Sequence, residues 1–106
     1  GLETAGEMPD AYLVMVGDRA RREGFALSER LRNEVPGIRL TIDCAGGGMK
    51  GQLKRADRSG ARLALILGED ELDAGTVAVK PLRERAEQES VPVDELSVRL
   101  LREASP

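Results

Sequence analysis

Apolar and polar positions recur along the chain with two periods, which predict a sheet crossed by helices. Unbroken apolar runs over 11–16 and 63–67 are typical of strands buried on both faces. Residues 38–43 alternate apolar with polar side chains, which predicts a strand covered on one face, with Asp43 on its polar side. Residues 76–80 predict a fourth strand, and the polar segment 86–90 predicts a fifth that pairs back on it.

Helical spacing fills the intervals between these strands. The first helix is expected to be capped by Asp18 and ended by Pro36-Gly37. Its apolar stripe is expected to consist of Ala20, Gly24, Leu27, Leu31 and Val35. The second helix follows a glycine loop, ends at Ser59-Gly60, and is expected to turn Met49, Leu53 and Ala56 inward. A last helix is expected to start at Pro92 and to bury Val93, Leu96, Leu100 and Leu101.

The order strand-helix-strand-helix-strand predicts an α/β fold with right-handed crossovers. The sheet should be largely parallel, covered on both faces, and finished by an antiparallel hairpin at one edge. Residues 10–106 are interpreted as one domain, and residues 1–9, polar and acidic, as a linker or cloning remnant. No apolar run reaches the roughly 20 residues of a membrane helix, and no segment resembles a signal peptide.

Composition removes several kinds of chemistry. The chain has 106 residues, a net charge of −3, no histidine and one cysteine, so histidine-based catalysis and an intrachain disulfide are excluded. Cys44 is expected to be a small buried or half-buried residue. Tyr12 and Phe25 are the only aromatic side chains, which leaves little material for stacking on RNA bases. Residues 48–62 nevertheless carry five Lys or Arg and one Asp, a local charge of +4.

The glycine loop admits three interpretations. Gly46, Gly48 and Gly51 satisfy the spacing G-x-G-x-x-G of dinucleotide-binding loops, although this loop follows the second predicted strand. The glycines also suit close packing of helix on sheet. Contact with an anion is favoured, because free backbone amides at a helix start attract negative charge and Lys50, Lys54 and Arg58 follow on one helix face. An ordinary solvated face remains the alternative for these cations.

Three carboxylates, at Glu69, Asp70 and Glu71, follow the buried strand 63–67 in a predicted acidic turn. Acid–base chemistry, binding of a hard metal, acceptance of hydrogen bonds from base edges, and a solvated turn are all compatible with them. Catalysis is disfavoured, because neither a histidine nor a second acidic cluster completes a catalytic set. No metal site is expected.

Several motifs together resemble the C-terminal anticodon-binding domain of bacterial histidyl-tRNA synthetases, class II aminoacyl-tRNA synthetases. The motifs are Gly46-Gly-Gly-Met-Lys50, Arg55-Ala-Asp-x-x-Gly-Ala61, Ala64-Leu-Ile-Leu-Gly-Glu-Asp-Glu71, Gly75-Thr-Val-x-Val-Lys80 and Leu82-Arg83. The resemblance runs from about Asp10 to the end of the chain. It departs from many relatives at Gly51 and Leu53, where a longer or aromatic side chain is common, and at Pro81, where an acid is common.

The resemblance implies a five-stranded mixed sheet flanked by three helices, without catalytic residues or a cofactor of its own. It implies a parent enzyme that is a cytoplasmic homodimer, whose separate catalytic domain uses ATP and Mg²⁺ to attach histidine to its tRNA. The partner of this chain would be the anticodon stem-loop of histidine tRNA. A small nucleotide-binding module using Gly46–Gly51 and a protein-interaction module are the alternatives.

Roles for individual residues follow as hypotheses. The glycine loop, including Gly47 and Gly48, would hold backbone phosphates together with Lys50, Lys54 and Arg58. Polar contacts to base edges would come from Glu69, Glu71, Lys80 and Arg83. Arg55 could turn either to the RNA or to Asp57 and the acidic turn.

Overall fold

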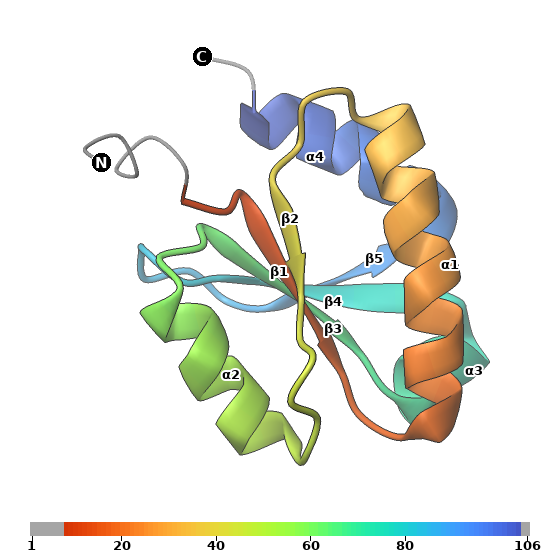
Figure 1. Cartoon of the computed structure of the whole chain (residues 1–106). Helices are drawn as coiled ribbons and strands as arrows, with labels where there is room; N and C mark the ends of the chain where they lie inside the picture. Colours follow the sequence, from red (N-terminus) through yellow and green to blue (C-terminus); the bar gives the residue numbers. More distant parts are fainter. Residues whose placement is uncertain (1–7, 105–106) are drawn as a thin grey trace.

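A five-stranded mixed sheet forms the centre of the protein in a computed structural model that describes residues 8–104 (Figure 1). The strands are β1 (Ala11–Met15), β2 (Leu40–Ile42), β3 (Leu63–Leu67), β4 (Thr76–Pro81) and β5 (Glu89–Pro92). Their order is β2-β1-β3-β4-β5; β1 runs parallel to β2 and β3, whereas β4 runs antiparallel to β3 and β5. The predicted α/β fold is therefore confirmed.

Helices cover both faces of this sheet. They are α1 (Asp18–Glu34), α2 (Met49–Arg58), the short α3 (Glu69–Ala74) and α4 (Leu96–Ala104), which follows a single 3₁₀ turn, η2 (Val93–Glu95). Figure 1 shows α1 and α4 on one side of the sheet and α2 on the other. Alternate residues of β1 face opposite ways: Leu13 and Met15 pack toward α1, and Tyr12 and Val14 pack toward α2.

The predicted stripe of α1 is buried along its whole length. Gly24 shows why one position in it is a glycine. A Cβ built there would lie 2.4 Å from Sδ of Met15, because α1 lies directly against β1 at this point. Glycine lowers the helix propensity at this position, but only a residue without a Cβ allows so close a contact.

The first helix and the last helix both begin differently from what the sequence predicts. Gly17, not Asp18, is the N-cap of α1, because its φ of 100° makes the turn into the helix; Asp18 then lies in the first turn and pairs with Arg21 at 2.5 Å. Pro92 ends β5 instead of starting a helix, because it still pairs with Thr76 of β4. The last helix begins at Leu96, and within it Leu101 is 43% exposed because Leu96 and Leu100 occupy the core.

The fifth strand is displaced by a few residues from its predicted position. It spans 89–92, not 86–90, and only Val91 of its four side chains is buried. Val91 pairs with Val77 of β4, so the burial of one apolar side chain sets the register. Of the predicted linker over residues 1–9, residues 1–7 lie outside the described part of the chain.

Candidate functional site

The glycine loop lies between β2 and α2, and Asp43 shapes it. Gly46 and Gly47 take left-handed conformations with φ of 76° and 87°. The Oδ1 atom of Asp43 accepts hydrogen bonds from the backbone amides of Ala45 at 3.1 Å and Gly46 at 2.9 Å. The amide of Gly46, which the sequence offered to an external anion, is thus occupied by an internal carboxylate together with the amide of Ala45. This arrangement also weakens the dinucleotide interpretation, which needs the loop amides for a pyrophosphate.

Asp43 is the centre of a buried polar network that the sequence did not reveal. It was predicted on the polar side of its strand, yet it is only 3% exposed. The Tyr12 hydroxyl donates to its Oδ2 at 2.7 Å, and Nε of Arg55 donates to the same oxygen at 2.9 Å. Arg55 also donates to the carbonyl of Gly46 at 2.5 Å. Arg55 therefore turns toward Asp43 and the glycine loop, and not toward Asp57 or the acidic segment.

The network shifts two ionisations. Burial disfavours the charge on Asp43, but hydrogen bonds from Arg55, Tyr12 and Gly46 outweigh it and hold the pKa of this carboxyl below its usual value. Burial, and then the hydrogen bond to Asp43, raise the pKa of Tyr12 to about 12. Asp43 is thus a stable anion and Tyr12 a stable neutral donor at neutral pH.

Gln52 anchors α2 to the sheet. Its side chain, fully buried, accepts from the amide of Met15 at 2.8 Å and donates to the carbonyl of Met15 at 2.7 Å. It also donates to the carbonyl of Gly47 at 2.8 Å. The prediction had turned Met49 inward; Met49 is 40% exposed, and Gln52 with Ala56 forms the buried side of α2. The pattern of apolar residues could not identify this buried face, because one of the buried residues, Gln52, is polar.

The backbone immediately before α2 retains open donors. Gly48 is its N-cap, and Gly47 and Gly48 are both exposed. Within residues 8–104, their backbone amides make no hydrogen bond. These two amides belong to exposed residues at the positively charged start of the helix, where an anion could meet them.

Three lysines from two elements meet at one groove. Lys50 and Lys54 of α2 and Lys80 of β4 line a hollow of about 650 Å³. Its other lining residues are Gly51, Leu53, Asp57, Pro81 and Leu82. Arg58 is exposed on the same helix but does not line this groove. Two of the predicted cations of α2 are therefore brought together with Lys80, which lies 26 residues from Lys54 in the sequence.

Arg83 lies beside this groove because it pairs with Asp57, one of the lining residues. It forms an ion pair with the carboxylate of Asp57 and donates to the Asp57 carbonyl at 3.0 Å. Since Asp57 lines the groove, the pair places a carboxylate and a guanidinium at its edge. Both side chains are largely exposed, so the pair can exchange partners at little energetic cost.

The two glutamates lie elsewhere. The predicted acidic turn is the helix α3, capped because Glu71 accepts from the amide of Gly68 at 2.9 Å. Glu69 pairs with Arg19 of α1 at 3.1 Å, and Leu72 of α3 packs against the core on the α1 side. Neither glutamate lines the lysine groove. In the described residues, no group of three acidic, cysteine or histidine side chains is placed to hold a metal ion.

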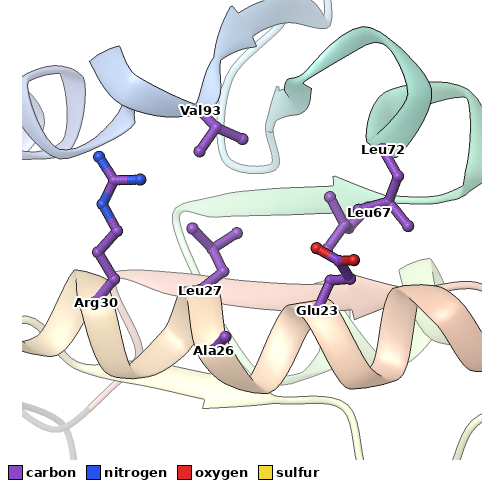
Figure 2. Close-up of a pocket in the computed structure, with 7 residues that line it drawn as sticks. All are labelled: Glu23, Ala26, Leu27, Arg30, Leu67, Leu72 and Val93. Atoms are coloured by element: carbon purple, nitrogen blue, oxygen red, sulfur yellow. The ribbon is translucent and has the colours of Figure 1, made fainter.

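A smaller hollow of about 200 Å³ lies on the opposite face, between α1 and the segment from α3 to η2. Figure 2 shows Leu27 and Val93 facing each other across it, with the charged side chains of Glu23 and Arg30 on α1. Arg30 is held by Glu34 at 3.2 Å and Asp94 at 3.3 Å. This hollow could not be predicted from the sequence, since its residues come from four separate elements.

Cys44 is exposed, contrary to prediction, at the end of β2. Its thiol is 3.4 Å from the carbonyl of Ile42, so it packs along the strand end and not into the core. No helix among residues 8–104 has both the length and the apolar character that crossing a bilayer requires.

Comparisons with known proteins agree on one family. The model of the anticodon-binding domain matches residues 10–103. A histidine–tRNA ligase of Hydrogenovibrio crunogenus is 50% identical over 96 residues, which are 91% of this chain and 22% of that protein. The chain thus spans about a fifth of the length of this curated relative.

Solved structures show the same likeness. The apo histidyl-tRNA synthetase of S. aureus matches 90% of this chain and 24% of its own, with 33% identity and a TM-score of 0.78. The histidyl-tRNA synthetase of Nostoc sp. PCC 7120, at 23% identity, has a TM-score of 0.81 over 92% of this chain and 23% of its own, and supports the fold. The resemblance stated from the sequence motifs is confirmed.

Proposed function

We propose, because the chain belongs to the anticodon-binding domain family, that it binds the anticodon stem-loop of a tRNA, and specifically of histidine tRNA. The specificity rests on the 50% identity to a histidine–tRNA ligase. On this proposal the chain is the tRNA-reading part of a larger histidine–tRNA ligase and has no catalytic activity by itself.

The observation that carries the proposal is the convergence of Lys50, Lys54 and Lys80 on one groove. The chain has a net charge of −3, so a cluster of three ammonium groups is a local exception and not a general property of the surface. Phosphate contacts from such a cluster would position an RNA loop without reading its sequence. The exposed amides of Gly47 and Gly48, and Arg58, would add further phosphate contacts along α2.

Sequence reading would come from the groups at the edge of the groove. Arg83 and Asp57 offer donors and an acceptor side by side, which suits the Watson–Crick edge of an unpaired base. Glu69 and Glu71 remain proposed base contacts, although each already has an intramolecular partner that an RNA would have to replace or share. Arg55 would act on the RNA through the glycine loop.

The parent enzyme is part of the same proposal. It would be a cytoplasmic homodimer, and its catalytic domain, a second partner of this chain, would bind ATP, Mg²⁺ and histidine. The relatives are much longer than this chain, which leaves room for such a domain. No residue of this chain is assigned to ATP or Mg²⁺.

A hairpin titration tests the proposal. The probe is a labelled 17-nucleotide anticodon stem-loop of histidine tRNA, and the control is the same hairpin with its anticodon bases exchanged. We expect the chain to bind the first hairpin more tightly, and Lys54→Ala to weaken both hairpins by a similar factor. Arg22→Ala, an exposed arginine of α1, is the matched control and should change neither. Equal binding of both hairpins would refute histidine specificity, and no binding of either would refute the function.

A further inference from the structure

We propose that the chain pairs with a second copy of itself along the outer edge of β5, so that two sheets join across a two-fold axis. The exposed side of α4 would pack against the same helix of the second copy beside that edge. This self-association does not rest on the proposed function, because the lysine groove lies on the α2 side of the sheet and α4 covers the other side (Figure 1).

The outer edge of β5 presents a backbone amide and a backbone carbonyl that the sheet does not use. The amide of Val93 bonds to the carbonyl of Gly75 at 3.0 Å, so Val91, two residues earlier, also faces β4. Ser90 lies between these inward positions, and its amide and carbonyl therefore point away from β4. Pro92 faces the same way but has no amide to offer. Ser90 is thus the residue of β5 that can both donate and accept at this edge.

The opposite edge of the sheet, formed by β2, is closed by side chains. Nη2 of Arg32 donates to the outward carbonyl of Leu40 at 3.1 Å, and the thiol of Cys44 lies 3.4 Å from that of Ile42. Folded proteins cover their sheet edges because an open edge recruits another strand. No side chain in the described part of the chain bonds to the backbone of Ser90. The difference between the two edges indicates that β5 is the edge that takes a partner strand.

The surface beside this edge carries a self-complementary pattern. A hollow of about 270 Å³ lies between β5 and α4, and Glu95, Val98 and Arg102 line it. Their spacings of three and four residues place them on one side of the helical segment. Val98 is 54% exposed, and neither Glu95 nor Arg102 forms an ion pair with another described residue. An exposed apolar side chain therefore lies between an unpaired acid and an unpaired base.

A two-fold axis perpendicular to the sheet at Ser90 satisfies the strand and the helix together. The two β5 strands then run antiparallel, and each Ser90 donates to and accepts from Ser90 of the second copy. The two α4 helices also run antiparallel, so that Val98 meets Val98 of the second copy and each Glu95 faces Arg102 of the second copy. Each contact occurs twice, as in other two-fold interfaces. The order of the charges along α4 therefore favours a second copy over an unrelated strand as the occupant.

Sedimentation of the whole chain tests the proposal. The contact involves one short strand and one helix side, which places it below roughly 1,200 Å² of buried surface, where complexes are weak and transient. We expect a dissociation constant on the order of 100 μM, so that single copies dominate at about 10 μM and pairs dominate near 1 mM. A reducing buffer prevents Cys44 from linking two copies through a disulfide.

Charge reversal tests the helix contact. Glu95→Arg and Arg102→Glu should each weaken association by about tenfold, because like charges then meet across the axis. The double variant Glu95→Arg/Arg102→Glu restores opposite charges and should return association to within about threefold of the unchanged chain. Glu29→Arg, at an exposed position of α1, is the matched control and should leave association unchanged.

A second pair of variants tests the strand contact. Ser90→Pro removes the outward amide but no bond to β4, and proline is tolerated in edge strands. It should weaken association by about tenfold, whereas Ser90→Thr, which keeps the amide, should not. Hydrogen exchange at the Ser90 amide should slow as the concentration of the unchanged chain rises. In Glu95→Arg it should not slow over the same range.

The mass of a single copy at every concentration would overturn the proposal. So would association that survives Ser90→Pro, because the copies would then meet at another surface. If Ser90→Pro does not fold, the exchange of the Ser90 amide in the unchanged chain decides instead, and exchange that is independent of concentration overturns the strand contact. Failure of the double variant to recover association would refute the pairing of the helices. None of these outcomes bears on hairpin binding, which is measured separately.

Discussion

Asp43 is a carboxylate without access to water, and three donors from different parts of the chain make its burial possible. Tyr12 of β1, Arg55 of α2 and the amides of the glycine loop all point at it. Because its pKa is lowered in the folded state, its contribution to stability is complete above the ordinary carboxyl pKa of about 4. That contribution is lost as the pH falls through the lower pKa of the folded state.

The phenol of Tyr12 should limit stability in alkali. Its pKa is raised to about 12, so its contribution is complete below pH 10 and is lost as the pH rises from 10 to 12. We expect the free energy of unfolding to fall by about 2–3 kcal/mol in this interval from Tyr12 alone. Tyr12→Phe should be less stable at pH 8 by about 1–2 kcal/mol, because a donor to a charged group is lost. Urea unfolding across pH 8–11.5 measures both, and an equally steep alkaline fall in Tyr12→Phe would contradict this account.

Arg55 and Lys54 are neighbours in sequence but should respond differently to mutation. Arg55→Ala removes the cation from a buried carboxylate; because the Arg55 side chain is 38% exposed and screened, we expect a loss of only about 1–3 kcal/mol in stability. Its positive charge is already matched by Asp43. The salt dependence of hairpin affinity should therefore stay the same. The affinity itself should fall, because the glycine loop loses the hydrogen bond from Arg55 to the Gly46 carbonyl.

Lys54→Ala is the matched comparison. It should leave stability within about 0.5 kcal/mol and make the slope of log affinity against log salt shallower by about 0.7, the value for one single-strand phosphate contact. Anisotropy titrations at four salt concentrations give both slopes. A shallower slope for Arg55→Ala, equal to that of Lys54→Ala, would show that Arg55 contacts a phosphate directly.

For individual residues, the cations of the groove could be predicted from the sequence, but the pairing of Arg55 with Asp43 could not. Lys50, Lys54 and Lys80 were singled out by charge and motif, and the structure brings them to one groove. Asp43 and Arg55 are separated by the loop 44–48, whose path depends on two left-handed glycines, and by the first six residues of α2. Periodicity places a side chain on a face of its own element and carries no information about such a path.

Among the elements, α2 is held to the sheet by the side chain of Gln52, which makes the hydrogen bonds that a neighbouring strand would make to β1. β2 ends at Ile42, so the amide and carbonyl of Met15 have no backbone partner on that side of β1. The side-chain amide of Gln52 takes that place and bonds to both groups. The position of the glycine loop is fixed by the same side chain through the carbonyl of Gly47.

Gln52→Met tests this anchor. Methionine has nearly the same length but leaves the amide and carbonyl of Met15 buried without partners, and we expect a loss of about 2–4 kcal/mol from two unsatisfied groups. Met49→Gln, the reverse exchange at an exposed position of the same helix, should change stability by less than about 0.5 kcal/mol. Urea unfolding of both variants decides it. Equal stability of the two would show that water replaces the Gln52 amide.

Element prediction succeeded where one pattern extended over the whole element, as with the helical periodicity of α1 and the unbroken apolar run of β3. It was wrong for Glu69, Asp70 and Glu71, which were expected to lie in a turn but form the first half of α3. Three acidic residues in succession resemble a solvated loop, yet negative charge at a helix start is stabilising, and Gly68 with Glu71 completes a cap. Gly75, in the left-handed conformation with φ of 71°, then ends the helix.

Over the whole molecule, the sheet separates two surfaces of different character. The α1 and α4 side rests on the larger core and carries ion pairs such as Arg30 with Glu34 and Asp94. The α2 side rests on a smaller core that includes four alanines and carries the lysine groove. On the proposed function, the lysine groove makes the α2 side the one from which an RNA would approach this chain of net charge −3.

Binding should consequently be moderate in its response to salt. Four cation–phosphate contacts, from the three lysines and Arg58, give a slope of log affinity against log salt of about −2.8, so that a rise from 50 to 200 mM salt weakens hairpin binding roughly 50-fold. Titration of the unchanged chain at these two concentrations measures it. A loss beyond about 500-fold would mean that further cations also contact the RNA, and no loss would exclude the phosphate contacts.

The topology itself was predictable, because alternating strands and helices with short connections admit few arrangements. What could not be predicted was the depth of contact between layers. Gly24 against Met15, and the alanines beneath α2, bring helices close to the sheet in a way that only coordinates reveal.

Cys44 gives this arrangement an experimental handle. It is the chain's one thiol, it is exposed, and it stands at the end of β2 immediately before the glycine loop. A maleimide dye would attach there and nowhere else, so the unmutated chain can carry its own optical reporter within a few residues of the surface where an RNA is expected to arrive.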